Sequence, residues 1–521
     1  MTSPRKSGIL LHPTSLPSRW GIGALDASAY AFVDFLTAAG QRLWQVMPLG
    51  PTGYGDSPYQ GFSAFAGNPL LISLDNLLAE GLLADEDLFG APSFPDAIVD
   101  YGAVIPFKEA LLRRSFERFI AAAAPEQRAA FADFRARNHA WLDDYALFAA
   151  LKQAHGGANW NTWPPETAAR QPAAIAYWTR ELSDQIEFHA YLQFQFFSQW
   201  RRLKQYANER GVRIVGDIPI FVAYDSADVW ANREIFALDD QGRPMVVAGV
   251  PPDYFSVTGQ LWGNPLYRWD VLARRGYDWW IERFRTTLTL VDIMRLDHFR
   301  GFAAYWEVPA GEATAVNGRW VAGPGAELFE KVDRALGMLP IIAEDLGLIT
   351  PDVLELRDRF NFPGMKVLQF AFGGGAEAPY LPHNYAPHCV VYTGTHDNDT
   401  TTGWWNTATP QEHTHVQLYL GRDGGDISWD FIRLALASVA ETAIIPLQDV
   451  LALGSEARMN TPGRAAGNWS WRYTPAMLTP QVIDRLRTLT ELYGRAPDNE
   501  AAEGAGNREL PRGYPSVNHE A

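Results

Sequence analysis

Cysteine is almost absent from the sequence, because its 521 residues include only Cys389. An intrachain disulfide requires two cysteines and a cysteine-based zinc site requires several, so both are excluded. Long apolar runs are absent too. No stretch reaches the ~20 apolar residues of a membrane-spanning helix, and Pro13 breaks the apolar stretch near the N-terminus too early for a signal peptide. We therefore expect a cytoplasmic protein without a membrane partner.

Positive charge is also scarce. The chain has 44 Lys and Arg residues against 60 Asp and Glu residues, which gives a formal net charge of −16. Such a surface repels phosphate backbones and anionic lipids, which argues against nucleic acid and membranes as partners. A neutral ligand is compatible with it. The 19 tryptophans would suit a carbohydrate, whose C–H faces pack on aromatic rings, although we expect most of them in the core.

Short apolar runs alternate with helical patterns along the chain. Runs that are apolar on both faces are typical of buried parallel strands. Eight candidates lie at residues 8–15, 42–49, 212–221, 291–299, 339–347, 365–372, 388–398 and 441–450. Eight strands that alternate with helices predict an α/β fold, the closed (β/α)8 TIM barrel. A doubly wound open sheet is the alternative that the pattern leaves open.

Helix signals precede most of the candidate strands. Asp26 is a candidate N-cap for a helix that Gly40 ends. Thr350 followed by a proline predicts another helix start. Further helices are predicted at residues 278–288, 326–336 and 430–440. Helices between parallel strands are what the crossovers of a βα repeat require.

The spacing of the strands predicts insertions into one catalytic barrel of residues 1–497. Residues from about 70 to 200, between the second and third strands, are expected to form a largely helical inserted subdomain. A second insertion, about 225–280, is rich in Pro, Gly and aromatic residues and is expected to form loops that cover the site. Little sequence follows the last strand, and residues 498–521 are predicted to be a flexible tail.

Polar side chains gather at the predicted carboxyl ends of four strands. They are Asp217, Arg295, Asp297, His298, Glu344, Asp345, His396, Asp397 and Asp399. In barrels of this type the active site lies at that face, and so many charges are costly to bury without a function. Two carboxylates, one ionised and one carrying a proton, are the minimum for glycoside chemistry. The set therefore indicates a carbohydrate-active site.

The residue types alone leave several assignments open. Arg295 stands two residues before Asp297, so both side chains point to one face of a strand. The guanidinium would favour the ionised form of Asp297, and a buried structural ion pair is the alternative. Glu344 and Asp345 are equally eligible as the proton donor, because a strand buried on both faces does not show which side is inward.

The third acid is open in the same way. Asp397 and Asp399 both follow the seventh candidate strand, and both lie in one short loop motif. Spacing does not choose between them.

Several motifs together carry a resemblance to a known family. They are RLDHFRGF (295–302), AEDLG (343–347), GTHDNDT (394–400), YGDSPYQ (54–60) and, within 251–265, PPDYFS, TGQ and WGNP. The chain resembles the amylomaltases of glycoside hydrolase family 77, also called 4-α-glucanotransferases or disproportionating enzymes. The resemblance runs from LHPTSLPS (11–18) to GNWSWR (467–472), nearly the whole chain. The first three motifs are shared with α-amylases, and the others narrow the resemblance to family 77.

The resemblance implies roles for particular residues. Asp297 corresponds to the nucleophile, Glu344 to the acid/base, and Asp397 to the third acid, which holds hydroxyls of the sugar being cleaved. Positions implied in substrate binding are Ser57, Tyr59, Asp217, Gln260, Trp262, Arg295, His396 and Asn468. It also implies a barrel without a C-terminal β-sandwich domain.

The implied activity is retaining transfer of α-1,4-glucan segments to the 4-hydroxyl of an acceptor glucan or glucose, within starch, glycogen and maltodextrin metabolism. Formation of cyclic glucans (cycloamylose) is a further product that depends on the shape of the groove. The expected ligands are α-1,4-glucans and maltooligosaccharides. We expect no cofactor, no metal and a monomer.

Three other functions compete with this one. An amylase-like hydrolase would use the same residues with water as acceptor. A metal-dependent barrel hydrolase would need ligands such as His298, His396 and Asp217, but the first candidate strand lacks a His-x-His pair and paired acids already account for these residues. A non-catalytic glucan-binding protein would have no need of intact acids.

Overall fold

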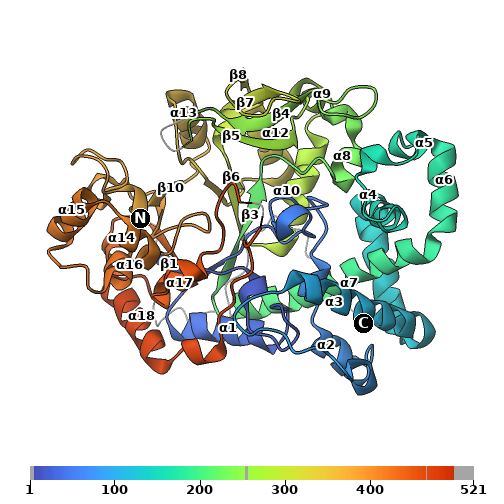
Figure 1. Ribbon diagram of the computed structural model, residues 1–521, viewed down its shortest axis with the longest axis horizontal. Coiled ribbons are helices and arrows are strands. Elements are labelled where there is room, and N and C mark those ends of the chain that lie inside the picture. Colours follow the sequence, from blue (N-terminus) through green and yellow to red (C-terminus); the bar gives the residue numbers. More distant parts are fainter. Residues whose placement is uncertain (1–4, 253–255, 465, 498–521) are drawn as a thin grey trace.

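The computed structural model describes residues 5–252, 256–464 and 466–497, and its centre is a barrel of eight parallel strands (Figure 1). Each strand overlaps one of the eight predicted runs. The strands are β1 (Lys6–Leu10), β2 (Leu43–Gln45), β3 (Arg213–Pro219), β6 (Ile293–Asp297), β9 (Ile341–Ala343), β10 (Gly364–Val367), β11 (Cys389–Tyr392) and β12 (Thr442–Pro446). The predicted tail, residues 498–521, lies outside the described residues.

The strand order shows that the sheet closes on itself. The order is β10-β11-β12-β1-β2-β3-β6-β9, so that the first strand pairs in parallel with the last one, β12, and with β2. The remaining gap is bridged where the Ala343 N–H of β9 donates to the Pro363 carbonyl just before β10, at 2.9 Å. The predicted (β/α)8 barrel is confirmed, and the open doubly wound sheet is excluded.

Helices surround the barrel and fill its insertions. They are α1 (Ala27–Ala38), α2 (Leu74–Ala79), α3 (Tyr101–Ala122), α4 (Pro125–Ala154), α5 (Pro165–Ala168), α6 (Pro172–Glu181), α7 (Ser183–Glu209), α8 (Ala227–Ala231), α9 (Trp269–Arg274), α10 (Asp278–Leu290), α11 (Arg300–Ala303), α12 (Gly325–Leu336), α13 (Pro351–Arg359), α14 (Thr401–Thr407), α15 (Pro410–Leu420), α16 (Ile427–Ala437), α17 (Leu447–Val450) and α18 (Pro480–Leu492). No helix in the described part of the chain has the length and apolar character needed to cross a membrane.

Two predicted helix starts turn out differently. The Asp26 side chain caps α1 by accepting from the Ser28 N–H, and Gly40 follows the helix with a φ of 71°. Thr350 does precede α13, but its side chain makes no capping hydrogen bond. Its hydroxyl instead accepts from Arg300 Nη2 at 3.4 Å. The Thr350 side chain therefore serves a long-range contact rather than the helix.

The helices between β2 and β3 lie together on one side of the barrel (Figure 1). The long helices α4 and α7 pack through aromatic side chains, with ring centroids 5.6 Å apart for Phe134 and Phe197 and 6.4 Å for Phe131 and Tyr191. The predicted helical run near 177–210 is divided, because Leu182 separates α6 from α7. The boundaries of an inserted subdomain in this range stay a prediction.

A second sheet, which the sequence pattern does not predict, lies beside the barrel. Its order is β5-β4-β7-β8, and its pairs are antiparallel. The strands are β4 (Val246–Val250), β5 (Gln260–Pro265), β7 (Ala304–Pro309) and β8 (Arg319–Ala322). Two of them belong to the 225–280 segment that was expected to form loops. In Figure 1 this sheet lies at the top, above β6.

Candidate active site

Four neighbouring or nearly neighbouring barrel strands deliver the predicted polar residues to one end of the barrel. Asp217 lies in β3, and Arg295 and Asp297 lie at the carboxyl end of β6. Glu344 follows β9 directly, and the 394–400 motif follows β11. Parallel strands in a closed barrel bring their carboxyl ends to one face, so chain segments far apart in sequence meet there.

Arg295 is the centre of the charge arrangement. It lies opposite Asp217 in the β3–β6 ladder. Its Nη1 binds Asp217 Oδ2 at 2.6 Å and its Nη2 binds Asp297 Oδ1 at 2.9 Å. Burial opposes the charge of Arg295, but the Asp217 and Asp297 carboxylates outweigh it and hold the pKa of Arg295 well above its ordinary value. The guanidinium therefore stays charged and fixes the direction of Asp297.

Asp297 is held between opposing influences. Burial raises its pKa, Arg295 lowers it and the neighbouring Asp217 raises it, so that its pKa is raised to about 6. Its side chain keeps 28% of its surface exposed, against 0% for Asp217. Of the two carboxylates on Arg295, only Asp297 is therefore open to a ligand.

Glu344 is bound by the main chain. Its Oε2 accepts from the His298 N–H at 2.6 Å, and its Oε1 accepts from the Leu346 N–H at 2.9 Å. Burial raises the pKa of Glu344, Arg295 lowers it and the charge of Asp297 raises it, so that the pKa is raised to about 7. Burial thus raises the pKa values of both acids, and acid/base chemistry requires the proton to reside on Glu344.

Tyr59 and His396 form one wall of the site, between Asp217 and Asp397. The Tyr59 hydroxyl donates to Asp217 Oδ2 at 2.8 Å, and its ring stacks on His396 with centroids 5.1 Å apart. His396 Nε2 lies 3.4 Å from Asp397 Oδ1. The Asn460 amide also donates to Asp397 Oδ1, at 2.6 Å. A continuous network therefore joins Tyr59 and Asp217 on one side to Asp397 on the other.

The structure separates the two pairs of acids that the sequence left open. Asp345 points away from the network: it accepts from Arg357 Nη1 at 2.6 Å and from the Met365 N–H at 2.7 Å. Asp399 accepts from the Ser455 hydroxyl at 2.7 Å and from the N–H of the next residue. Both carboxylates link parts of the fold, whereas Glu344 lies in the electrostatic field of Arg295 and Asp297, and Asp397 lies beside His396.

The other predicted site residues make local contacts. Trp262 stands edge-on to the His298 ring with centroids 4.8 Å apart, and its Nε1 donates to Gln260 Oε1 at 3.1 Å. The Ser57 hydroxyl accepts from the Tyr59 N–H at 3.3 Å. The Asn468 amide bonds to its own loop, accepting from Thr461 N–H at 3.0 Å and donating to the Arg464 carbonyl at 2.9 Å. Trp262 and Ser57 thus lie next to residues of the network, while the Asn468 amide organises a loop.

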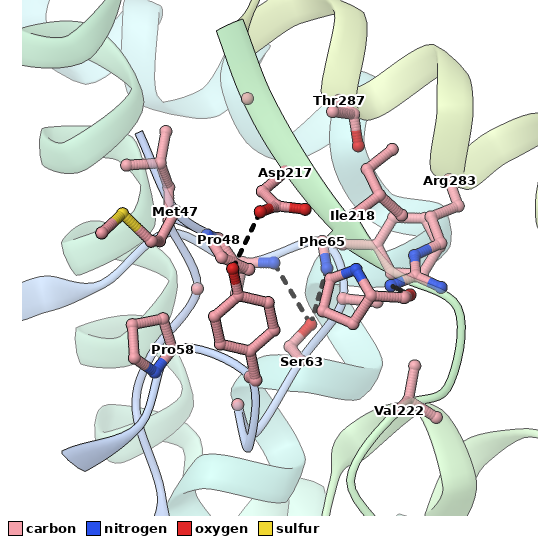
Figure 2. A pocket seen from close by; sticks show the side chains of 18 of the residues that line it. Met47, Pro48, Pro58, Ser63, Phe65, Asp217, Ile218, Val222, Arg283 and Thr287 are labelled. Carbon is pink, nitrogen blue, oxygen red and sulfur yellow. Dashed lines mark hydrogen bonds between the residues drawn. The ribbon is translucent and has the colours of Figure 1, made fainter. Parts of the chain in front are cut away.

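A cavity of about 70 Å³ lies behind the Asp217–Tyr59 wall. Figure 2 shows the Asp217 carboxylate in it, together with the hydrogen bond that this group accepts. Arg283 lines the far side, where it donates to the Pro219 carbonyl at 2.7 Å. Asp297 and Glu344 do not line this cavity. The cavity therefore lies next to Tyr59 and Asp217 and is not the place where the two reacting carboxyl groups meet a substrate.

Sequence reasoning missed two residues that hold Asp397. Asn460 binds its carboxylate, and Arg458 donates to its main-chain carbonyl at 2.6 Å. Both lie more than 60 positions later in the chain, outside any helix or strand pattern. No signal in the sequence pointed to them.

Within residues 5–252, 256–464 and 466–497, no group of three or more His, Cys, Asp or Glu side chains is arranged to hold a metal ion. Arg295 pairs with Asp217 and Asp297 instead, while the buried Asp217 Oδ1 accepts no hydrogen bond from the described residues.

A family model described as 4-alpha-glucanotransferase matches residues 11–479. The chain belongs to the 4-alpha-glucanotransferase family. The 4-alpha-glucanotransferase of Thermus thermophilus is 56% identical over 503 residues, covering 95% of this chain and all of the relative. The 4-alpha-glucanotransferase of a Synechocystis species is 53% identical, and the match covers 95% of this chain and 99% of the relative. The family that the motifs predicted is therefore confirmed, and the chain is an enzyme of the transferase class.

A solved structure supports the same family at the level of the fold. The amylomaltase from Streptococcus agalactiae, solved in complex with acarbose, superposes with a TM-score of 0.92 at 39% identity. The match covers 95% of this chain and 100% of that one. The two chains therefore share one fold over nearly their whole lengths.

Proposed function

We propose that this 4-alpha-glucanotransferase transfers α-1,4-glucan segments by a retaining double displacement, with Asp297 as nucleophile, Glu344 as acid/base and Asp397 as the acid that holds the sugar. The observation that carries the assignment is the pair Asp297 and Glu344 at one barrel mouth, both within the field of Arg295. An ionised nucleophile beside a protonatable partner is the arrangement that glycoside cleavage requires.

In the first displacement, an Asp297 carboxylate oxygen attacks the anomeric carbon of the donor. The bond from that carbon to the glycosidic oxygen breaks, and the proton of Glu344 passes to the departing oxygen. Arg295 holds Asp297 ionised and oriented for the attack. The reducing-end fragment leaves, and the rest of the glucan is esterified to Asp297.

In the second displacement, Glu344 is a carboxylate and acts as base. It takes the proton of the 4-hydroxyl of an acceptor glucan or of glucose while that oxygen attacks the anomeric carbon and Asp297 leaves. The main-chain N–H groups of His298 and Leu346 stabilise the carboxylate that this step needs. Two inversions give net retention of the α configuration.

Substrate contacts are assigned to the surrounding wall. Tyr59, Arg295 and His396 would surround the sugar being cleaved, with the fully buried Asp217 holding Tyr59 and Arg295 in place. Ser57, Gln260, Trp262 and Asn468 would bind further along the glucan. The ligands are α-1,4-glucans and maltooligosaccharides, and nucleic acid and membranes are not partners of so acidic a chain. We place the enzyme in the cytoplasm as a monomer, and we assign the 225–280 segment to a cover that limits the entry of water.

The products formed from maltotriose test transfer against hydrolysis. A transferase makes glucose and longer oligosaccharides while the total number of reducing ends stays constant, because each cleaved bond is replaced by another. A hydrolase raises the number of reducing ends in step with cleavage. Chromatography of the oligosaccharides together with a reducing-end assay measures both quantities. A rise in reducing ends equal to the glucose released would contradict the proposed transfer.

The pKa values of the two acids predict a bell-shaped pH dependence of kcat/KM. Asp297, whose pKa is raised to about 6, must be ionised, so activity falls as the pH drops below that value. Glu344, whose pKa is raised to about 7, must carry a proton, so activity falls as the pH rises above that value. We expect a maximum between these values, measured as initial rates at low maltotriose concentration. A flat profile from pH 5 to pH 9 would exclude this pair.

A further inference from the structure

His298 occupies an unusual backbone conformation directly after Asp297. Its φ is 52°, in the left-handed region that residues with a Cβ atom rarely adopt. The imidazole does not account for this conformation through its Nε2 atom, which is buried and has no hydrogen-bond partner among the described residues. The cause therefore has to be sought in what the main chain of this turn does.

The turn presents two successive N–H groups to Glu344. The His298 N–H donates to Glu344 Oε2 at 2.6 Å, and the Phe299 N–H donates to the Glu344 carbonyl at 3.1 Å. The turn is itself closed by a bond from the Gly301 N–H to the His298 carbonyl at 2.9 Å. Both the side chain and the main chain of Glu344 are thus held by the residues that follow Asp297.

Glu344 depends on these donors. Its carboxyl oxygens accept only from the His298 and Leu346 N–H groups in the hydrogen bonds of the described residues. The charged or titratable groups that face it are Arg295, Asp297 and Tyr380. An N–H that donates to a carboxylate favours its ionised form, so these donors oppose burial and the charge of Asp297.

We propose that residue 298 is a positioning residue for the acid/base, and that it acts through its left-handed backbone rather than through its imidazole. This inference rests on the proposed function, since it needs Glu344 as the acid/base. The left-handed turn aims one N–H at Glu344 Oε2, fixes the direction of the carboxyl group towards Asp297 and stabilises the carboxylate formed after proton transfer.

The side chain is seated by its surroundings. The ring meets Trp262 edge-on at 4.8 Å. Gly301 lies so close that a Cβ there would be 3.2 Å from His298 Cδ2 and 2.8 Å from Ile220 Cδ1. The ring therefore packs the turn in place, but the hydrogen bond to Glu344 needs only the N–H.

Variants of residue 298 separate the backbone from the imidazole. Glycine adopts a left-handed φ freely and asparagine does so more readily than most residues, whereas valine strongly resists it. We expect His298→Gly and His298→Asn to keep the basic limb of the kcat/KM profile at its wild-type pH, whatever loss follows from removing the ring. We expect His298→Val to lose about 10- to 100-fold in kcat/KM, the effect of one hydrogen bond to a charged group.

The pH profile gives the decisive measurement. Loss of the hydrogen bond from the residue-298 N–H to Glu344 in His298→Val should raise the pKa of Glu344 and move the basic limb up by about one pH unit. His298→Ala, which resists the left-handed region less than valine does, serves if the valine variant does not fold, and circular dichroism checks each protein. If Gly, Asn and Val or Ala all shift the limb alike, or none does, the backbone role is wrong.

The failure of this inference is distinguishable from the failure of the proposed function. Glu344→Gln is measured in parallel. If that variant keeps the basic limb, Glu344 is not the acid/base and the proposed function itself fails. If the basic limb disappears in Glu344→Gln while the variants of residue 298 all behave alike, only the positioning role is overturned.

Discussion

Replacing Asp297 by asparagine is expected to reduce glucan transfer by at least ~10⁴-fold, the scale on which loss of a nucleophile acts. The amide is nearly the same size, so the fold is retained, but it is a far weaker nucleophile and cannot form the ester intermediate. The Arg295 side chain keeps its second carboxylate partner, Asp217, at 2.6 Å. Glucose release from maltotriose measures the loss, and calorimetry with a maltooligosaccharide measures binding, which we expect to persist.

Asp399→Asn is the matched control for this prediction. The change is chemically the same and the residue lies in the same part of the barrel, but Asp399 binds Ser455 and the N–H of Thr400 rather than the network. We expect it to lose stability and to keep the same mechanism. An Asp297→Asn enzyme with activity near that of the wild type would show that another group attacks the sugar, and the assignment of Asp297 would be abandoned.

Much of the barrel could be predicted from local sequence because its strands are buried on both faces. The eight apolar runs are long enough to be distinguished, and caps such as Asp26 mark the starts of helices. The position rule for barrels then predicts that Asp217, Asp297 and Glu344 meet at one face. These features depend on short stretches of chain, and short stretches are what a sequence displays directly.

The second sheet could not be predicted because its pairing is not local. β4 pairs with β7, so that Val246 lies opposite Pro309 and Gly249 lies opposite Trp306. Both the β4 and the β5 segments contain glycine, and β5 also ends in proline. Burial runs in blocks along each strand, so neither shows the alternation expected of a half-buried strand. The partner strand β7 follows β6 in the chain, whereas β4 and β5 precede β6.

The sequence could not distinguish the adjacent acids Glu344 and Asp345 for a related reason. Glu344 and Asp345 are distinguished only by what meets them: the His298 N–H on one side, and Arg357 on the other. Those partners come from 46 positions earlier and 12 positions later in the chain. Only the resemblance to a family could choose in advance, and its choice of Glu344 stays a prediction.

Replacing Glu344 by glutamine is expected to slow transfer from maltotriose by about 10²- to 10⁴-fold, the usual contribution of a general acid. The loss should depend on the leaving group. A glycosidic oxygen needs a proton as it departs, whereas fluoride leaves without one. We therefore expect Glu344→Gln to retain much of the first displacement when the donor is an α-maltosyl fluoride, measured as release of fluoride ion.

The second displacement provides an independent readout of the same residue. Without a base at position 344, a sugar hydroxyl attacks the intermediate slowly, and the ester on Asp297 should accumulate as a mass increase of one maltosyl unit. Azide needs no base, so adding it should speed turnover and give a maltosyl azide of retained α configuration. Asp345→Asn is the control, because its carboxylate binds Arg357 and the Met365 N–H. Equal losses with maltotriose and with the fluoride donor, and no response to azide, would assign proton transfer to another group.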